Sequence, residues 1–262
     1  MKRCLFILVI CCLPLSAKPA DSTDVSLDVI HTSWYCSAES LSRNVDIYLP
    51  KAANGQQSAV SEQRYPVLYL IHGINGYEGS WQEKGDAPDT LARKIEQGLC
   101  EPMILVMPDC NKWPYKVHPG GKNLWRYLFR YGRVSREHEI EYSISELMTM
   151  IDSTYAVAPY CAIAGLSDGA RIAANVANLR PDRVRTVGLF SPVLHKDQLP
   201  KDSTQMYYIY VGTKDVFAGS GKRFHRRMKR ACYPHGFTKL PGGHNWRVWR
   251  MCLSEFLEVE AR

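Results

Sequence analysis

Hydrophobic and polar positions along the chain form two kinds of pattern. Short, continuous apolar runs predict strands that are buried on both faces of a parallel sheet. These runs cover Pro66 to Ile71, Met103 to Met107, Cys161 to Ala164, Val184 to Phe190 and Met206 to Val211. An earlier segment, Val45 to Leu49, alternates apolar and polar residues and ends at Pro50, which predicts a partly exposed strand.

Between these runs, apolar residues recur every three or four positions, as on one face of a helix. The repeats are Leu91, Ile95 and Leu99; Ile140, Ile144, Leu147, Ile151 and Tyr155; Ile172, Ala173, Val176 and Ala177; and Trp249, Cys252, Leu253, Phe256 and Leu257. Strands alternating with helices predict an α/β fold with a mostly parallel central sheet flanked by helices. At 262 residues and 45% hydrophobic composition, we expect one domain.

Residues 1–17 have the order of a secretory signal peptide: Lys2 and Arg3, an apolar stretch, then Ser16-Ala17. About a dozen apolar residues fall short of the roughly 20 that a membrane-spanning helix needs. We therefore expect cleavage after Ala17, a mature domain over residues 18–262, a secreted or periplasmic location and no stable membrane span after cleavage. Bulky Ile10 before Cys11 disfavours a lipoprotein anchor.

The formal net charge of +7 falls to +5 without Lys2 and Arg3, an excess too small to indicate a nucleic-acid partner. The cations gather in two segments. The second segment, which begins at Lys222, also contains Phe224, Met228 and Ala231. The spacing of these three apolar residues predicts an amphipathic helix with a solvated basic face. The segments contain Arg126, Arg130, Arg133 and Arg136, and Lys222, Arg223, Arg226, Arg227, Lys229 and Arg230.

Six of the nine cysteines remain outside the signal segment, and an oxidising compartment permits disulfides between them. Cys100 and Cys110 bracket a predicted strand, which holds them too far apart to bond. Cys232 and Cys252 can meet only if their helices pack side by side. Cys161 is expected to be a small core residue. The remaining disulfide pairings, including any that involve Cys36, stay open. No metal-ligand spacing such as C-x-x-C appears in the sequence.

The segment AGLSDGA at 164–170 places G-x-S-x-G between an apolar strand and a helix of small residues. Two glycines in this context let the strand and helix approach closely around a strained turn, which raises the serine hydroxyl above the sheet at a helix N-terminus. The pattern predicts Ser167 as a nucleophile.

A nucleophilic serine needs a base and an acid, which follow it in the order Ser, Asp or Glu, His in this kind of fold. Asp215 follows the strand Met206 to Val211, so its carboxylate is expected at the same sheet edge as Ser167. His244 lies in a glycine-rich loop between the short strand Phe237 to Leu240 and the last helix. The alternatives are Asp197 and Asp202 for the acid, and His225 and His235 for the base.

Acyl transfer also requires donors for the oxyanion of the tetrahedral intermediate. One is expected to be the backbone N–H of Asp168. The second is expected from the loop His72-Gly73-Ile74-Asn75-Gly76, where Gly73 allows a turn that presents the N–H of Ile74. An ordinary glycine turn is the alternative.

Five segments together resemble the esterase branch of the α/β-hydrolase superfamily that includes esterase D and the feruloyl esterases. They are YPVLYLIHGINGYEGSW at 65–81, PMILVMPD at 102–109, AGLSDGA at 164–170, VGTKD at 211–215 and GGHNWRVW at 242–249. The resemblance implies Ser167, Asp215 and His244 as a triad, with no metal or cofactor. It implies the N–H groups of Ile74 and Asp168 as the oxyanion hole.

One departure from the family pattern concerns the residue after the serine. The family commonly has S-M-G-G where this chain has Ser167-Asp168-Gly169-Ala170. A negative side chain pointing into the site would oppose formation of the oxyanion. Because the first turn of a helix favours Asp, we expect the side chain to point outward.

The expected function is that of a secreted serine carboxylic ester hydrolase that forms an acyl-serine and removes feruloyl or acetyl groups from plant polysaccharide or a related carbohydrate ester. Export argues against the cytosolic substrate of S-formylglutathione hydrolases. The alternatives are a siderophore trilactone esterase, a sugar acyltransferase and a catalytically silent binding protein. Candidate substrate contacts are Trp81, Trp125, Arg126 and Arg130. The acyl group, the alcohol and the oligomeric state stay open.

Overall fold

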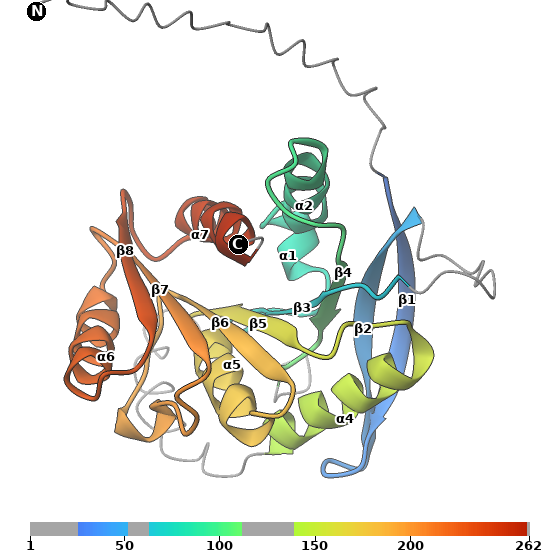
Figure 1. The fold of residues 1–262 in the computed structure, drawn as a ribbon, viewed down its shortest axis with the longest axis horizontal. Helices are drawn as coiled ribbons and strands as arrows, with labels where there is room; N and C mark the ends of the chain where they lie inside the picture. The colour runs from blue at the N-terminus through green and yellow to red at the C-terminus, as the bar shows by residue number, and fades with distance from the viewer. Residues whose placement is uncertain (1–25, 52–62, 112–138, 261–262) are drawn as a thin grey trace, which may run out of the picture.

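The computed structural model describes residues 26–51, 63–111 and 139–260. These residues form an eight-stranded sheet with helices on both faces (Figure 1). In chain order the elements are β1 (Leu27–Cys36), β2 (Leu41–Pro50), β3 (Val67–Ile71), α1 (Ser80–Glu83), α2 (Ala87–Glu96), β4 (Ile104–Pro108), α4 (Glu139–Thr154), β5 (Cys161–Leu166), α5 (Asp168–Leu179), β6 (Val184–Phe190), the 3-10 turn η2 (Lys196–Gln198), β7 (Met206–Gly212), α6 (Ala218–Arg230), β8 (His235–Leu240) and α7 (Trp246–Glu260).

The strand order is β1-β2-β4-β3-β5-β6-β7-β8. Every pair from β4 to β8 is parallel, whereas β1 and β2 are antiparallel to their neighbours, which confirms the predicted mostly parallel sheet. The expectation of a partly exposed strand over Val45 to Leu49 is wrong, because these two residues are 0% and 1% exposed. β2 lies between β1 and β4, and the pattern search did not predict β1.

The continuous apolar runs are explained by the two layers of helices. In β3, Val67, Tyr69 and Ile71 belong to the core formed with α4, α5 and α6, while Leu68 and Leu70 belong to the core formed with α1, α2 and α7. Successive residues of a strand point to opposite faces, so both sets are buried only when helices cover both sides. Figure 1 shows α7, α1 and α2 on one side of the sheet and α4, α5 and α6 on the other.

Three helical repeats extend further in sequence than the helices do. In one of them, Tyr155 directly follows the last residue of α4. α2 stops at Glu96, because Gly98 at φ +66° turns the chain and leaves Leu99 41% exposed. In α6, Phe224 and Met228 are fully buried as predicted, but Ala231 lies past the last helical residue and is exposed. Among the described helices, none is both long and apolar enough to cross a bilayer.

The six cysteines of the described residues are all free thiols. The possible pairing of Cys232 with Cys252 is wrong: Cys232 is exposed after α6, and Cys252 is buried in α7. These helices pack on opposite faces of the sheet, so the two thiols cannot meet. Cys161 is 4% exposed in β5 and is the core residue that its strand predicts.

Candidate active site

Ser167 stands on a strained turn between β5 and α5. Its backbone has φ 54° and ψ −112°, and its N–H donates to Phe190 O at 2.8 Å. A Cβ at Gly165 would overlap the Gly169 carbonyl, and one at Gly169 would overlap the His72 carbonyl. Both glycines are therefore required for β5, α5 and the loop after β3 to approach so closely.

Asp215 and His244 reach Ser167 from two other loops at the carboxyl end of the sheet. His244 Nδ1 lies 3.0 Å from Asp215 Oδ2, and His244 Nε2 lies 3.0 Å from Ser167 Oγ. An ionised carboxylate only accepts hydrogen bonds, so Nδ1 carries the proton and Nε2 accepts from the serine hydroxyl. This arrangement connects all three side chains by hydrogen bonds and leaves Nε2 available as a base.

The alternative acids and bases lie elsewhere. Asp202 precedes the amino end of β7 and accepts from Thr204, while Asp197 in η2 accepts from Gln198. His225 and His235 bond to each other, at 2.9 Å between Nδ1 and Nε2, beside the groove described below. None of these four shares a hydrogen bond with Ser167 in the part of the chain that the structure describes.

The environment of His244 and Asp215 holds them in one arrangement. Burial raises the pKa of Asp215, but hydrogen bonds from His244 and from the Phe217 N–H, at 2.7 Å, outweigh it and lower the pKa below its usual value. The imidazole lies against the rings of Phe217 and Trp249, whose centroids are 4.8 and 5.0 Å away. Sequence reasoning did not assign either aromatic residue to the site.

The loop after β3 lies directly beside the nucleophile. A Cβ at Gly73 would come within 3.5 Å of Ser167 Cβ, and the loop closes with a bond from Gly76 N–H to Gly73 O at 3.1 Å. Asn75 adopts φ 59° within this turn. Among the described residues, neither the N–H of Ile74 nor that of Asp168 donates to a backbone oxygen. Within the described residues, both amides therefore lack a backbone acceptor.

His72 connects this loop to the end of β4. It is 3% exposed, and its Nδ1 donates to Gly73 O at 2.7 Å while its Nε2 accepts from the Cys110 N–H at 2.8 Å. An imidazole that donates from one nitrogen and accepts at the other is neutral. His72 thus holds the loop in place without adding a positive charge.

The side chain of Asp168 is held in place by hydrogen bonds from Arg171. Arg171 Nε donates to Asp168 Oδ1 at 2.8 Å, and its Nη1 donates to Glu141 Oε1 at 3.1 Å. Burial lowers the pKa of Arg171, but Asp168 and Glu141 outweigh it and raise the pKa, so the guanidinium stays charged. Arg171 therefore pairs with the carboxylate beside Ser167 and shares its single positive charge between Asp168 and Glu141. The i, i+3 spacing of Asp168 and Arg171 was the only sequence signal for this pair.

The predicted substrate contact of Trp81 is wrong. Its side chain is 1% exposed, its Nε1 donates to Ile71 O at 3.1 Å, and its ring packs on Phe190 and Trp246. An indole with its N–H satisfied inside an apolar core is a packing residue. The other three predicted contacts, Trp125, Arg126 and Arg130, lie outside the described residues.

Residues 39–208 match the protein family described as "Putative esterase". A curated relative, an endo-1,4-beta-xylanase/feruloyl esterase of Xylanibacter ruminicola, is 26% identical over 94% of this chain. The match covers 34% of the relative, so this chain spans about a third of its length.

Solved structures with the same fold include a ferulic acid esterase from the anaerobic fungus Anaeromyces mucronatus. It has a TM-score of 0.72 and 19% identity, over 94% of this chain and 95% of that one. An S-formylglutathione hydrolase from Staphylococcus aureus has a TM-score of 0.67 and 14% identity, over 91% and 98% of the two chains. These TM-scores show a shared α/β-hydrolase fold.

Proposed function

Because this chain belongs to the "Putative esterase" family and has the α/β-hydrolase fold, we propose that it is a carboxylic ester hydrolase whose catalytic triad is Ser167, His244 and Asp215. The observation that carries the proposal is the pair of 3.0 Å contacts that His244 makes, through Nε2 to Ser167 Oγ and through Nδ1 to Asp215 Oδ2. Removal of the hydroxyl proton and stabilisation of the resulting imidazolium require these two contacts.

The reaction proceeds in two halves. Ser167 Oγ bonds to the ester carbonyl carbon while its proton passes to His244 Nε2, and the carbonyl electron pair moves onto the oxygen. The N–H groups of Ile74 and Asp168 hold this oxyanion. On collapse of the tetrahedral intermediate, the C–O bond to the alcohol breaks and His244 protonates the departing oxygen. Water then attacks the acyl carbon and loses a proton to His244. The bond between the acyl carbon and Ser167 Oγ breaks, His244 returns the proton to Oγ, and the acid is released.

Asp215 acts on the imidazole and does not itself take a proton. Its lowered pKa keeps it ionised throughout, so it holds Nδ1 protonated and stabilises the imidazolium. Phe217 and Trp249 shield the ring from water and limit its rotation. Asp168 contributes its N–H alone, because its carboxylate is paired with Arg171.

For the substrate, the proposal is a feruloyl or acetyl ester of plant polysaccharide or of a related carbohydrate. It is supported by the curated relative, whose printed name joins a xylanase to a feruloyl esterase. A panel of methyl ferulate, acetylated xylan and a catecholate trilactone at equal enzyme concentration tests it. Preference for either of the first two supports the proposal, and preference for the trilactone contradicts it.

The same proposal includes export of the chain. Residues 1–17 act as a signal peptide and residues 18–262 form a single secreted or periplasmic esterase domain. Mass spectrometry of the mature protein measures the cleavage site. A protein that begins at Lys18 supports this assignment, and an intact Met1 in the exported fraction contradicts it.

The triad is tested by hydrolysis of p-nitrophenyl acetate and methyl ferulate. Ser167→Ala is expected to lower kcat by about 10⁵-fold or more, because the nucleophile is lost. Ser153→Ala, which removes an exposed hydroxyl at the end of α4, is the matched control and is expected to keep the parent rate. Unchanged turnover in Ser167→Ala would overturn the assignment.

A further inference from the structure

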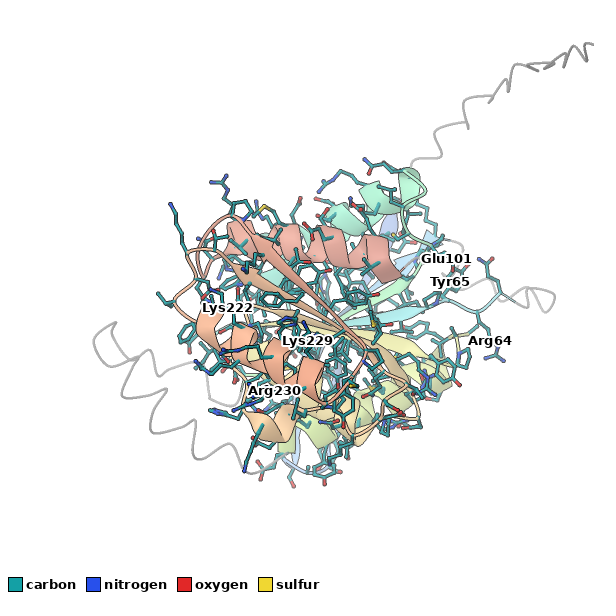
Figure 2. The ribbon with its side chains drawn as sticks, turned by 60° about the vertical axis from the view of Figure 1, so that its left-hand side comes forward. Arg64, Tyr65, Glu101, Lys222, Lys229 and Arg230 are labelled. Atoms are coloured by element: carbon teal, nitrogen blue, oxygen red, sulfur yellow. The ribbon has the colours of Figure 1, made fainter. Side chains whose placement is uncertain are left out.

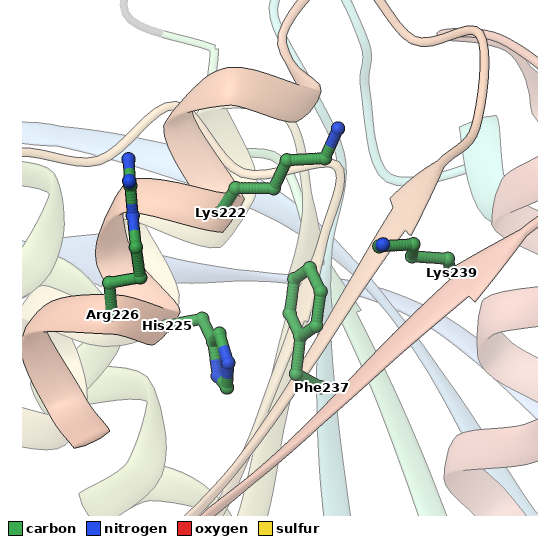
Figure 3. A pocket seen from close by; sticks show the side chains of 5 residues that line it. All are labelled: Lys222, His225, Arg226, Phe237 and Lys239. Carbon is green, nitrogen blue, oxygen red and sulfur yellow. The ribbon is translucent and has the colours of Figure 1, made fainter.

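A hollow lies away from the triad, between α6 and β8. Its volume is about 660 Å³, and Figure 3 shows the side chains that line it. Lys222 and Arg226 are four residues apart on the helix, while Phe237 and Lys239 are two apart on the strand, so each pair shares one face of its element. His225 completes the lining. We call this hollow the α6–β8 groove.

The groove collects positive charge that no carboxylate of the described residues pairs with. In the described part of the chain, no ion pair involves Lys222, Arg226 or Lys239. Several arginines elsewhere are paired, including Arg43 with Glu39 and Arg183 with Asp152. α6 carries six cationic residues and no acidic one, and Figure 2 labels Lys222, Lys229 and Arg230 along it. Like charges held close together repel one another and raise the free energy of the folded protein, and a bound anionic ligand would lower it.

The wall of the groove between the cations is aromatic and neutral. The rings of His225 and Phe237 stack at 4.5 Å with 18° between their planes. His235 Nδ1 donates to Tyr233 O, so its Nε2 accepts from His225 Nδ1 at 2.9 Å. Burial, then His235, Lys229 and Arg226, lower the pKa of His225 below its usual value. The groove therefore offers an apolar ring surface framed by permanent charges.

The groove also lies close in the chain to the catalytic loops. α6 begins at Ala218, shortly after Asp215, and β8 ends at Leu240, shortly before His244. Lys222 in the first half of the helix and Lys239 at the end of the strand are its lining residues nearest in sequence to those loops. A polymeric ligand bound in the groove can therefore extend toward the carboxyl end of the sheet, where Ser167 lies.

We propose that the α6–β8 groove binds a polysaccharide chain that carries carboxylate groups. The carboxylates pair with Lys222, Arg226 and Lys239, and a sugar ring packs against Phe237. Three cations spread over two elements match spaced charges along a polymer better than one small anion, and the volume suits a few sugar units. The choice of a carbohydrate polymer rests on the proposed function. The groove then holds the polymer whose ester group enters the active site.

The test measures binding of polygalacturonate, an ester-free acidic polysaccharide, by isothermal titration calorimetry at low salt. Neutral arabinoxylan is the uncharged comparison. The variant Lys222→Gln/Arg226→Gln/Lys239→Gln removes three charges from the groove. The matched control, Arg223→Gln/Lys229→Gln/Arg230→Gln, removes three exposed charges of α6 that do not line it. Circular dichroism checks that both variants fold, and p-nitrophenyl acetate checks that both stay active.

The expected result is at least a tenfold loss of polygalacturonate affinity in the groove variant and less than a twofold loss in the control. Binding by the parent protein should weaken steeply with added salt. An equal loss in both variants would mean that diffuse charge, rather than the groove, binds the polymer. Absence of binding by the parent, or tighter binding of duplex DNA at the same salt concentration, would also overturn the proposal.

The inactive variant separates this proposal from the proposed function. Ser167→Ala is expected to bind polygalacturonate with unchanged affinity, because Ser167 is not part of the groove. If Ser167→Ala stays active, the triad assignment fails while the binding result stands. If the groove variant binds as well as the parent, the groove assignment fails while the triad stands.

Discussion

The charged residues beside Ser167 and those in the α6–β8 groove are arranged in opposite ways. Near Ser167, the carboxylate of Asp168 pairs with Arg171, whose guanidinium also donates to Glu141. In the groove, Lys222, Arg226 and Lys239 face one hollow without an ion pair in the described part of the chain. The first arrangement fixes charges in place, and the second leaves them for a ligand. The contrast separates residues that build the reaction centre from residues that bind.

The largest expected effect concerns the triad itself. Asp215→Asn keeps the size of the side chain but replaces an acceptor by an amide that can donate toward His244 Nδ1. The imidazole then favours the tautomer that cannot accept the Ser167 proton, so kcat should fall by on the order of 10³–10⁴-fold. Steady-state hydrolysis of methyl ferulate measures this. Asp202→Asn, a half-buried carboxylate before β7, is the control, and a similar loss there would contradict the assignment.

The next effect concerns the paired charges. Arg171→Gln leaves the carboxylate of Glu141, which is 1% exposed, without its cation. The free energy of unfolding should fall by about 3 kcal/mol, since an uncompensated buried charge is costly. Urea denaturation measures it. Arg93→Gln, from an exposed pair with Asp86, should change stability by less than about 1 kcal/mol. Equal losses in the two variants would show that burial of the pair is unimportant.

The same substitution tests the charge beside the nucleophile. Without Arg171, an unpaired Asp168 carboxylate stands beside the N–H proposed to hold the oxyanion, so kcat/KM for methyl ferulate should fall. Asp168→Asn/Arg171→Gln removes the carboxylate as well and should return kcat/KM toward the parent value. A merely structural role for Arg171 predicts no such return.

The contributions of the two regions to stability should also depend on pH over different ranges. The lowered pKa of Asp215 contributes stability that is present above its unfolded pKa of about 3.9 and is lost as the pH falls through the folded value. The lowered pKa of His225 contributes stability that is lost as the pH falls below about 6.5. Stability from pH 7 to 5 should therefore decline less in His225→Asn than in the parent, by urea denaturation. Parallel curves would contradict this.

The smallest effect concerns the unpaired charges. Lys222→Gln/Arg226→Gln/Lys239→Gln removes mutual repulsion and should raise the Tm by about 1–2 °C at low salt. Near 1 M salt the difference should vanish, because exposed charges are then screened. Differential scanning calorimetry at two salt concentrations measures this. A lower Tm at low salt would show that these cations have stabilising partners.

Several features of the fold were predictable because they depend on neighbours in the chain. The predicted strand Val184 to Phe190 matches β6 residue for residue, since five of its seven residues are buried and only Arg185 and Thr186 are polar. β1 was missed because few of its residues are buried. The burial of Val45 to Leu49 was mispredicted, because the neighbouring strand and helices that cover it are distant in sequence.

By itself, the sequence determined the α/β class, the esterase resemblance and the candidates Ser167, Asp215 and His244. These follow from local periodicity, from glycines that a tight turn requires and from chain order. Only the tertiary structure decided that Trp81 packs in the core, that Arg171 joins Asp168 to Glu141, and that Lys239 lies across a groove from Lys222. The physical reason is that burial and charge pairing depend on which distant segments come into contact. The spacing of residues along the chain does not specify these contacts.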